Sequence, residues 1–166
     1  MKTFRDSHLS KIRLPSLSIY IIIEHQSSER KLMSEQINLS ALFPVSPNRI
    51  FNAWLNGKEH TVMTGAKATA STKVGGKFTA WDGYISGINL ELISNKRILQ
   101  SWRSTEFPNG HLDSYLLVKL EEVKVGTKVA LVHSEIPEGQ SASYKKGWRD
   151  FYFIPMKAYF AKNKSK

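Results

Sequence analysis

The sequence predicts an α+β domain in which a curved antiparallel sheet of six or seven strands packs around a long C-terminal helix. One strand and one or two short helices precede a continuous run of predicted strands. After Pro137 the apolar period changes from that of a strand to that of a helix. The longest predicted strand, residues 111–123, alternates apolar and polar side chains, so one face of the sheet meets water, which favours an antiparallel sheet.

The first two elements are a strand and a helix. Apolar side chains alternate over residues 37–43, the period of a half-buried strand. Ser46-Pro47 begins a helix, because Ser offers an N-cap oxygen and Pro at the first helical position loses no hydrogen bond. Asn56-Gly57 ends that helix, and residues 58–64 are expected to form a second short one.

The strands that follow are separated by short turn sequences. Asp82-Gly83 is the strongest of these, because this dipeptide favours the tight turn of a hairpin. A two-residue turn pairs Trp81 with Tyr84 and sets Phe78 opposite Gly87, where the ring covers the glycine and fixes the register. The expected strands are residues 66–72, 77–81, 84–93, 98–105, 111–123 and 127–136.

A helix is predicted over residues 141–161. Its aromatic stripe consists of Tyr144, Trp148, Phe151, Tyr152, Pro155 and Tyr159 at helical spacing. Pro155 has no N–H to donate to the carbonyl of Phe151, so we expect a kink inside this helix.

Several short motifs resemble one protein family. They are Gly75-Gly76-Lys77-Phe78, Asp82-Gly83-x-x-Ser86-Gly87, Lys96-Arg97-Ile98 through Trp102-Arg103, Pro108-Asn109-Gly110-His111, His133-Ser134-x-Ile136-Pro137 and Gly147-Trp148. In this order and spacing they are similar to the C-terminal domain of the activator of heat-shock protein 90 ATPase (Aha-type), in the START-like, Bet v 1-like (SRPBCC) superfamily. The resemblance covers residues 36–160 and implies the helix-grip fold, in which the sheet curls around the last helix.

Residues 1–32 do not share this pattern and are expected to be an N-terminal extension outside the domain. A short apolar run, residues 17–23, follows basic side chains, but Glu24 closes it and no small-x-small cleavage site follows, so a signal peptide is not predicted. Met33 is a candidate true start. Residues 33–163 then form the helix-grip domain, and residues 164–166 form a basic tail.

Composition and charge exclude several classes of protein. The 166 residues include 24 Lys and Arg against 14 Asp and Glu, a formal net charge of +10, and no Cys. Disulfide frameworks, thiol catalysis and Cys-based metal sites are therefore excluded. The positive charges are scattered, which favours a solvated basic surface over one that binds a polyanion or an acidic partner, and we predict no nucleic-acid partner. No apolar stretch is long enough to span a membrane, so we expect a cytoplasmic protein with no membrane partner.

An aromatic interior that grips a helix can leave a hollow suited to a small apolar or lipid-like ligand. The candidates for its lining are Trp54, His60, Trp81, Trp102, Tyr115, His133, Trp148 and Phe151. The alternative is that these side chains simply form the hydrophobic core.

The histidines raise the question of catalysis. His133 shares a strand face with Val129 and Leu131, so it is expected to point inward, either as a satisfied core residue or as an acid–base or ligand contact. His60 is expected at the cavity mouth. The sequence has no His–carboxylate pair at metal-binding spacing, no Gly-x-Ser-x-Gly elbow and no phosphate loop, so no metal, no cofactor and no serine hydrolase are predicted.

The favoured hypothesis is a non-enzymatic binding module that holds a small apolar ligand between sheet and helix. One alternative, which the resemblance implies, is a co-chaperone-like protein that binds the heat-shock protein 90 chaperone. Another is an enzyme like the polyketide cyclases and dehydratases of the superfamily, for which the sequence offers His133 but no second catalytic group.

The domain boundary at Met33 leads to a first prediction. A chain that begins at Met33 should melt within a few degrees of the full chain, because residues 1–32 are expected to contribute no packing. A calorimetric shift beyond about 8 °C would contradict this, since it corresponds to two or more kcal/mol for a domain of this size.

Overall fold

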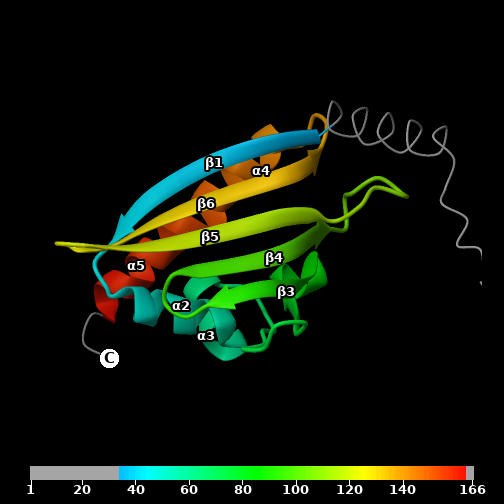
Figure 1. Ribbon diagram of the computed structural model, residues 1–166. Helices are drawn as coiled ribbons and strands as arrows, with labels where there is room; N and C mark the ends of the chain where they lie inside the picture. The colour runs from blue at the N-terminus through cyan, green and yellow to red at the C-terminus, as the bar shows by residue number, and fades with distance from the viewer. Residues whose placement is uncertain (1–33, 164–166) are drawn as a thin grey trace, which may run out of the picture. The chain divides into compact units, whose positions relative to one another are not determined.

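Six strands form one antiparallel sheet in the order β1-β6-β5-β4-β3-β2 (Figure 1). The structure is a computed structural model that describes residues 34–163. The expected extension, its boundary at Met33 and the basic tail lie outside the described residues. The strands are β1 Ser34–Phe43, β2 Lys77–Ala80, β3 Ile85–Ile93, β4 Arg97–Ser104, β5 Ser114–Val123 and β6 Gly126–Pro137.

The helices lie on one face of the curved sheet, which confirms the predicted α+β helix-grip fold (Figure 1). Two short helices follow β1: α2 Pro47–Leu55 and α3 Gly57–Thr64. The C-terminal helix consists of α4 Ser141–Gly147, a π-helical segment η2 Trp148–Phe153, and α5 Ile154–Lys162. No helix within residues 34–163 has both the length and the apolar character needed to cross a membrane.

The two short helices begin at the side-chain caps that their sequences supply. The Ser46 hydroxyl accepts a hydrogen bond from the Arg49 N–H at 3.4 Å, as predicted for the start of α2. Asn56 ends α2 and also caps α3, because its side-chain oxygen accepts from the Glu59 N–H at 3.0 Å. A cluster of Arg49, Glu59 and Tyr159 then connects both helices to α5: Tyr159 donates to Glu59 at 2.7 Å, and Arg49 pairs with Glu59.

The β2–β3 hairpin has the predicted register but a longer loop. Phe78 pairs with Gly87, and a Cβ atom at position 87 would lie 2.6 Å from the Phe78 ring, so only glycine fits under this ring. The last strand pair is Ala80 with Ile85, and the Tyr84 N–H donates to the Trp81 carbonyl at 3.0 Å. The predicted two-residue turn is therefore wrong: η1, Trp81–Gly83, has positive φ throughout and makes a four-residue loop.

Two predicted strand segments are loops. Residues 66–72 contribute only an isolated bridge between Thr69 and Thr79, so six of the seven expected strands form. Residues 111–113 lie outside β5 because Arg103 holds them: its guanidinium donates to the His111 carbonyl at 2.7 Å and pairs with Asp113 at 3.2 Å.

Near Pro155, where a kink is expected, the helix contains a π turn. The Ile154 N–H donates to the Arg149 carbonyl, which lies five residues earlier, as in a π-helix. Pro155, which has no N–H to donate, is the next residue and lies in the first turn of α5. Of the predicted stripe, Tyr144, Trp148 and Tyr152 are buried, and the buried face continues through Met156 and Phe160 in place of Pro155 and Tyr159. Phe151, which the α-helical period placed on the stripe, is 51% exposed.

Trp148 is the central anchor of this helix. Its side chain is 3% exposed and packs against Trp102, Trp54 and Tyr152, with ring centroids 4.5–6.4 Å away.

We predict that Trp148→Ala lowers the free energy of unfolding by about 3–5 kcal/mol, because a large buried side chain is replaced by a cavity. Urea denaturation measures this. Phe151→Ala, on the same helix at an exposed position, is the matched control and should cost less than about 1 kcal/mol. Equal effects of the two substitutions would contradict the assigned orientation of the helix.

Candidate functional site

The space between the sheet and the C-terminal helix is filled by side chains. The void that remains there has a volume of about 10 Å³, room for about one water molecule. Its lining includes Trp54, His60, Trp102 and Trp148, four of the residues proposed from the sequence. These residues are therefore core, and an enclosed ligand cavity does not exist at this place.

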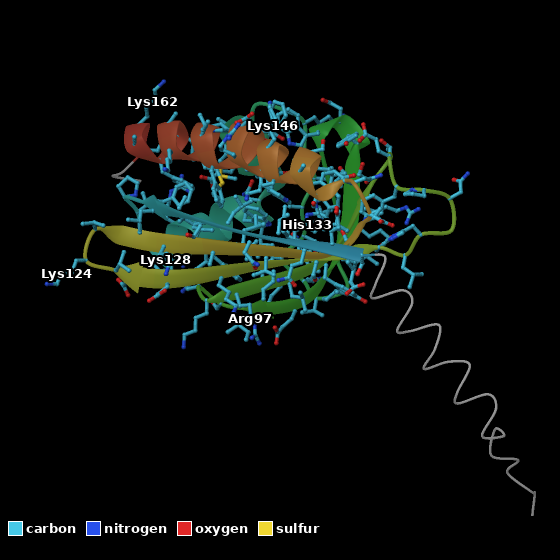
Figure 2. All side chains as sticks on the ribbon, turned by 90° about the horizontal axis from the view of Figure 1, so that it is seen from above. Arg97, Lys124, Lys128, His133, Lys146 and Lys162 are labelled. Carbon is cyan, nitrogen blue, oxygen red and sulfur yellow. The ribbon has the colours of Figure 1, made fainter. Side chains whose placement is uncertain are left out.

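A chain of hydrogen bonds crosses this core and connects the helix to the sheet. The Trp148 indole N–H donates to Nδ1 of His133 at 3.1 Å, and Nε2 of His133 lies 2.8 Å from the Ser114 hydroxyl. The Ser114 hydroxyl donates to the Trp102 carbonyl at 2.8 Å. Because an indole nitrogen only donates, His133 must be neutral with its proton on Nε2. Figure 2 shows His133 between the sheet and the helix.

Burial lowers the pKa of His133 to about 3, because the charged imidazolium would have no solvent around it. Both ring nitrogens have partners, and the ring centroid lies 4.6 Å from that of Trp102. Of the two predicted alternatives for His133, this geometry favours the satisfied core residue, since both nitrogens are already occupied and the pKa lies far from neutral pH.

A second chain of hydrogen bonds begins at the other buried indole. Trp54 donates to the Gln100 side-chain oxygen at 3.2 Å, and Gln100 donates to the Asn89 side-chain oxygen at 2.8 Å. Asn89 then donates to the carbonyls of Ser71 and Lys73 at 2.7 and 3.1 Å. These contacts hold the loop over residues 66–76 and explain why this segment does not form the expected strand.

His60 lies beside Trp54 in the core and not at a cavity mouth. Its Nδ1 donates to the Trp54 carbonyl at 3.1 Å, and burial lowers its pKa. Nε2 has no partner among the described residues. His60 is thus a neutral core histidine that lines the small void.

An open cleft of about 430 Å³ lies between the β2–β3 loop and the C-terminal helix. Trp81 and Phe151 contact each other in its lining, with ring centroids 5.0 Å apart and ring planes tilted by 59°. Trp102, Trp148 and Tyr152 form deeper parts of the lining. Four of the residues proposed from the sequence therefore contribute to this cleft: Trp81, Trp102, Trp148 and Phe151.

Two tyrosine hydroxyls and one lysine give the cleft its polar character. The Tyr144 hydroxyl donates to the Gln140 side-chain oxygen at 2.8 Å. Burial raises the pKa of Tyr144 to about 12 and raises that of Tyr84, so both hydroxyls stay protonated at neutral pH. Lys146 lines the cleft and pairs with Asp150 at 2.8 Å.

Tyr115 was expected in the lining, and this expectation is wrong. It is 46% exposed on the face of the sheet opposite the helix, because the neighbouring positions 114 and 116 point inward. The cleft also has lining residues that were not predicted from the sequence, although Tyr144 and Tyr152 belonged to the predicted stripe: Tyr84, Ile85, Ser143, Tyr144, Lys146, Gly147 and Tyr152. No group of three His, Asp or Glu side chains within residues 34–163 could hold a metal ion.

The fold and the comparisons identify the class of protein. The order of elements and the curved sheet around the last helix are those of START-like, Bet v 1-like helix-grip proteins. The family described as "Activator of Hsp90 ATPase homolog 1-like protein" matches residues 44–161. The chain belongs to this family.

Two relatives have descriptions that agree with this family. The chain is 28% identical over 130 residues to the human "Activator of 90 kDa heat shock protein ATPase homolog 1", covering 78% of this chain and 38% of the human protein. It is 24% identical over 136 residues to the homologue from Dictyostelium discoideum, covering 82% of this chain and 36% of that protein. The chain thus spans well under half of the length of these relatives.

Solved structures match most of the described domain. An HSP90 activator from Plasmodium falciparum is 27% identical with a TM-score of 0.68, covering 78% of this chain and 96% of that one. The Aha1 dimer from Colwellia psychrerythraea is 20% identical with a TM-score of 0.66, covering 76% and 96%. The second comparison supports the fold alone.

The neutral state of His133 leads to a prediction about acid stability. The pKa of His133 is about 3 in the folded state and about 6.5 in the unfolded chain, so between these values only the unfolded chain binds the proton. The free energy of unfolding should therefore fall as pH falls, with a His133 contribution of about 2 kcal/mol between pH 7 and pH 5. His60 adds a loss of the same sign.

In His133→Gln this pH-dependent loss should be smaller than in the wild type by about 2 kcal/mol, whatever the substitution costs at pH 7. Urea denaturation at the two pH values provides the comparison. An unchanged pH dependence in the variant would mean that His133 is protonated in the folded state.

Proposed function

We propose that the chain is a non-enzymatic binding module of the Hsp90-ATPase-activator-like family, and that its open cleft holds a small apolar ligand. The cleft itself carries this proposal: about 430 Å³ in volume, it is lined mainly by aromatic side chains. Ligand sites are typically 300–1,000 Å³, mostly apolar, with a few polar groups that fix orientation.

The residues around the cleft support binding more than catalysis. Its titratable neighbours at the polar end, Tyr84 and Tyr144, remain protonated at neutral pH. His133, the histidine expected to act in an enzyme, is engaged by Trp148 and Ser114. The Tyr84 hydroxyl can orient a carbonyl or hydroxyl group of a bound aromatic or lipid-like molecule. The Tyr144 hydroxyl, whose proton is donated to Gln140, can accept from a ligand hydroxyl.

A second candidate function is a contact with a heat-shock protein 90 chaperone. The family description and the HSP90 activator from Plasmodium falciparum, of which this chain matches 96%, favour it. In this function the cleft would accept an apolar side chain of the chaperone, and the basic surface would meet acidic groups. Both functions are proposed for the cytoplasm, the compartment expected from the sequence.

Calorimetric titration with a panel of fatty acids and flavonoid-like aromatics tests the cleft. We expect saturable binding that changes little as salt rises past about 0.15 M, because apolar contacts are not screened. Phe151→Ala should weaken binding about tenfold, since one aromatic wall is lost. Leu42→Ala, at a similarly exposed position on the opposite face of the sheet, is the matched control and should leave the affinity unchanged.

The purified chaperone is titrated in the same way. Tight, salt-sensitive chaperone binding with no response to any ligand would reject the ligand proposal in favour of the second candidate. If Phe151→Ala and Leu42→Ala weaken ligand binding equally, the ligand binds elsewhere on the domain and not in the cleft.

A further inference from the structure

The exposed face of the C-terminal helix is strongly basic. Between Ser141 and Lys162 the helix has five cationic side chains and one acidic residue, Asp150. The cations are Lys145, Lys146, Arg149, Lys157 and Lys162, all exposed, and they define what we call the basic helix face. Figure 2 shows Lys146 and Lys162 on this helix, on the side away from the sheet.

The single carboxylate on this face is already neutralised. Asp150 pairs with Arg149 at 2.7 Å and with Lys146 at 2.8 Å, and these cations hold the pKa of Asp150 at about 2. Lys145, Lys157 and Lys162 form no ion pair with another described residue. Within residues 34–163, no carboxylate neutralises the charge of these three lysines.

The π turn places a large apolar side chain among these cations. Ile154 is 57% exposed, and its N–H donates to the carbonyl of Arg149, so it stands one turn beyond Arg149. Lys157 follows one α-helical turn later. Phe151, at the edge of the cleft, is the other large apolar side chain exposed on this helix. Arg149, Ile154 and Lys157 therefore follow one another along the helix, so that an exposed apolar side chain lies between two cations.

We infer that the basic helix face is a docking surface for an acidic segment of a protein partner, with one large apolar side chain of that segment packing on Ile154. Charge complementarity would steer and orient the segment, and the apolar contact would fix its position along the helix. This inference goes beyond the cleft and holds whether or not the cleft takes a ligand.

The geometry favours a protein segment over a membrane surface. A helix that lies in a bilayer interface buries a broad apolar face in the lipid. Here that face, which includes Trp148, Met156 and Phe160, is already buried against the sheet. A nucleic acid would use the cations but would gain little from the exposed Ile154.

The test uses a labelled peptide of about ten residues, because the helix is about 33 Å long and an extended chain covers about 3.3 Å per residue. The peptide is made of Asp and Glu with one central Leu, and a second peptide has Ser in place of Leu. Fluorescence anisotropy with the full chain measures the affinities. Lys145→Glu with Lys157→Glu reverses two charges on the basic helix face.

The matched control is Lys119→Glu with Lys124→Glu, which changes the net charge by the same amount. Lys119 is exposed on the opposite face of the sheet, and Lys124 lies in the β5–β6 turn. We expect the Leu peptide to bind about tenfold more weakly to the helix variant and to retain its affinity for the control variant. Ile154→Ser should remove the preference for the Leu peptide over the Ser peptide, and circular dichroism should show all variants folded.

Equal weakening by both double variants, or by neither, would overturn the proposal, because binding would then follow net charge or another surface. An Ile154→Ser variant that keeps the Leu preference would also overturn it. Vesicles with phosphatidylserine and a single-stranded DNA oligomer form the remaining arms. Tighter binding of either than of the peptide, lost in the helix variant, would assign the face to lipid or nucleic acid instead.

Discussion

The hydrogen bond from the Trp148 indole to His133 is the contact on which the arrangement of helix and sheet depends. It joins the C-terminal helix to β6. His133 is hydrogen-bonded in turn to Ser114 on β5, and Ser114 donates to the Trp102 carbonyl on β4. A buried indole N–H without a partner would cost about 1–3 kcal/mol. The bond therefore determines which turn of the helix lies over which strands, and it requires a neutral imidazole.

This connection explains where the domain is open. Because Trp148 and Trp54 pack into the interior with their N–H groups satisfied, the space under the helix is filled. Between the helix and the β2–β3 loop, room remains at the edge of the sheet, where Trp81 and Phe151 line the cleft. A domain of this kind can bind at its edge without exposing its core, which suits the proposed binding function better than enclosed chemistry.

Local patterns predicted much of this fold, and most of the failures have a common physical cause. The cap at Ser46, the pairing of Phe78 with Gly87 and the inward direction of His133 all follow from residues close together in the sequence. The loop over residues 66–72 and the π turn depend on partners far away, such as Asn89, or on a helix fitting a curved sheet. Phe151 was misplaced because a period assigns a face only while the element is regular, and the π turn breaks that regularity. Tyr115 was misplaced for another reason: β5 is regular, and its alternation, followed strictly, puts Tyr115 on the outer face.

The most direct test of this account is the protonation state of His133, measured by nitrogen-15 NMR of the imidazole ring. The structure requires a hydrogen-bonded, unprotonated Nδ1 and a protonated Nε2. We expect both nitrogen shifts of His133 to remain those of this neutral tautomer from pH 7 down to about pH 4.5, since the pKa is about 3. Titration of the ring with a pKa near 6, or a proton on Nδ1 at neutral pH, would contradict this hydrogen-bond arrangement, because Trp148 would then have no acceptor on β6.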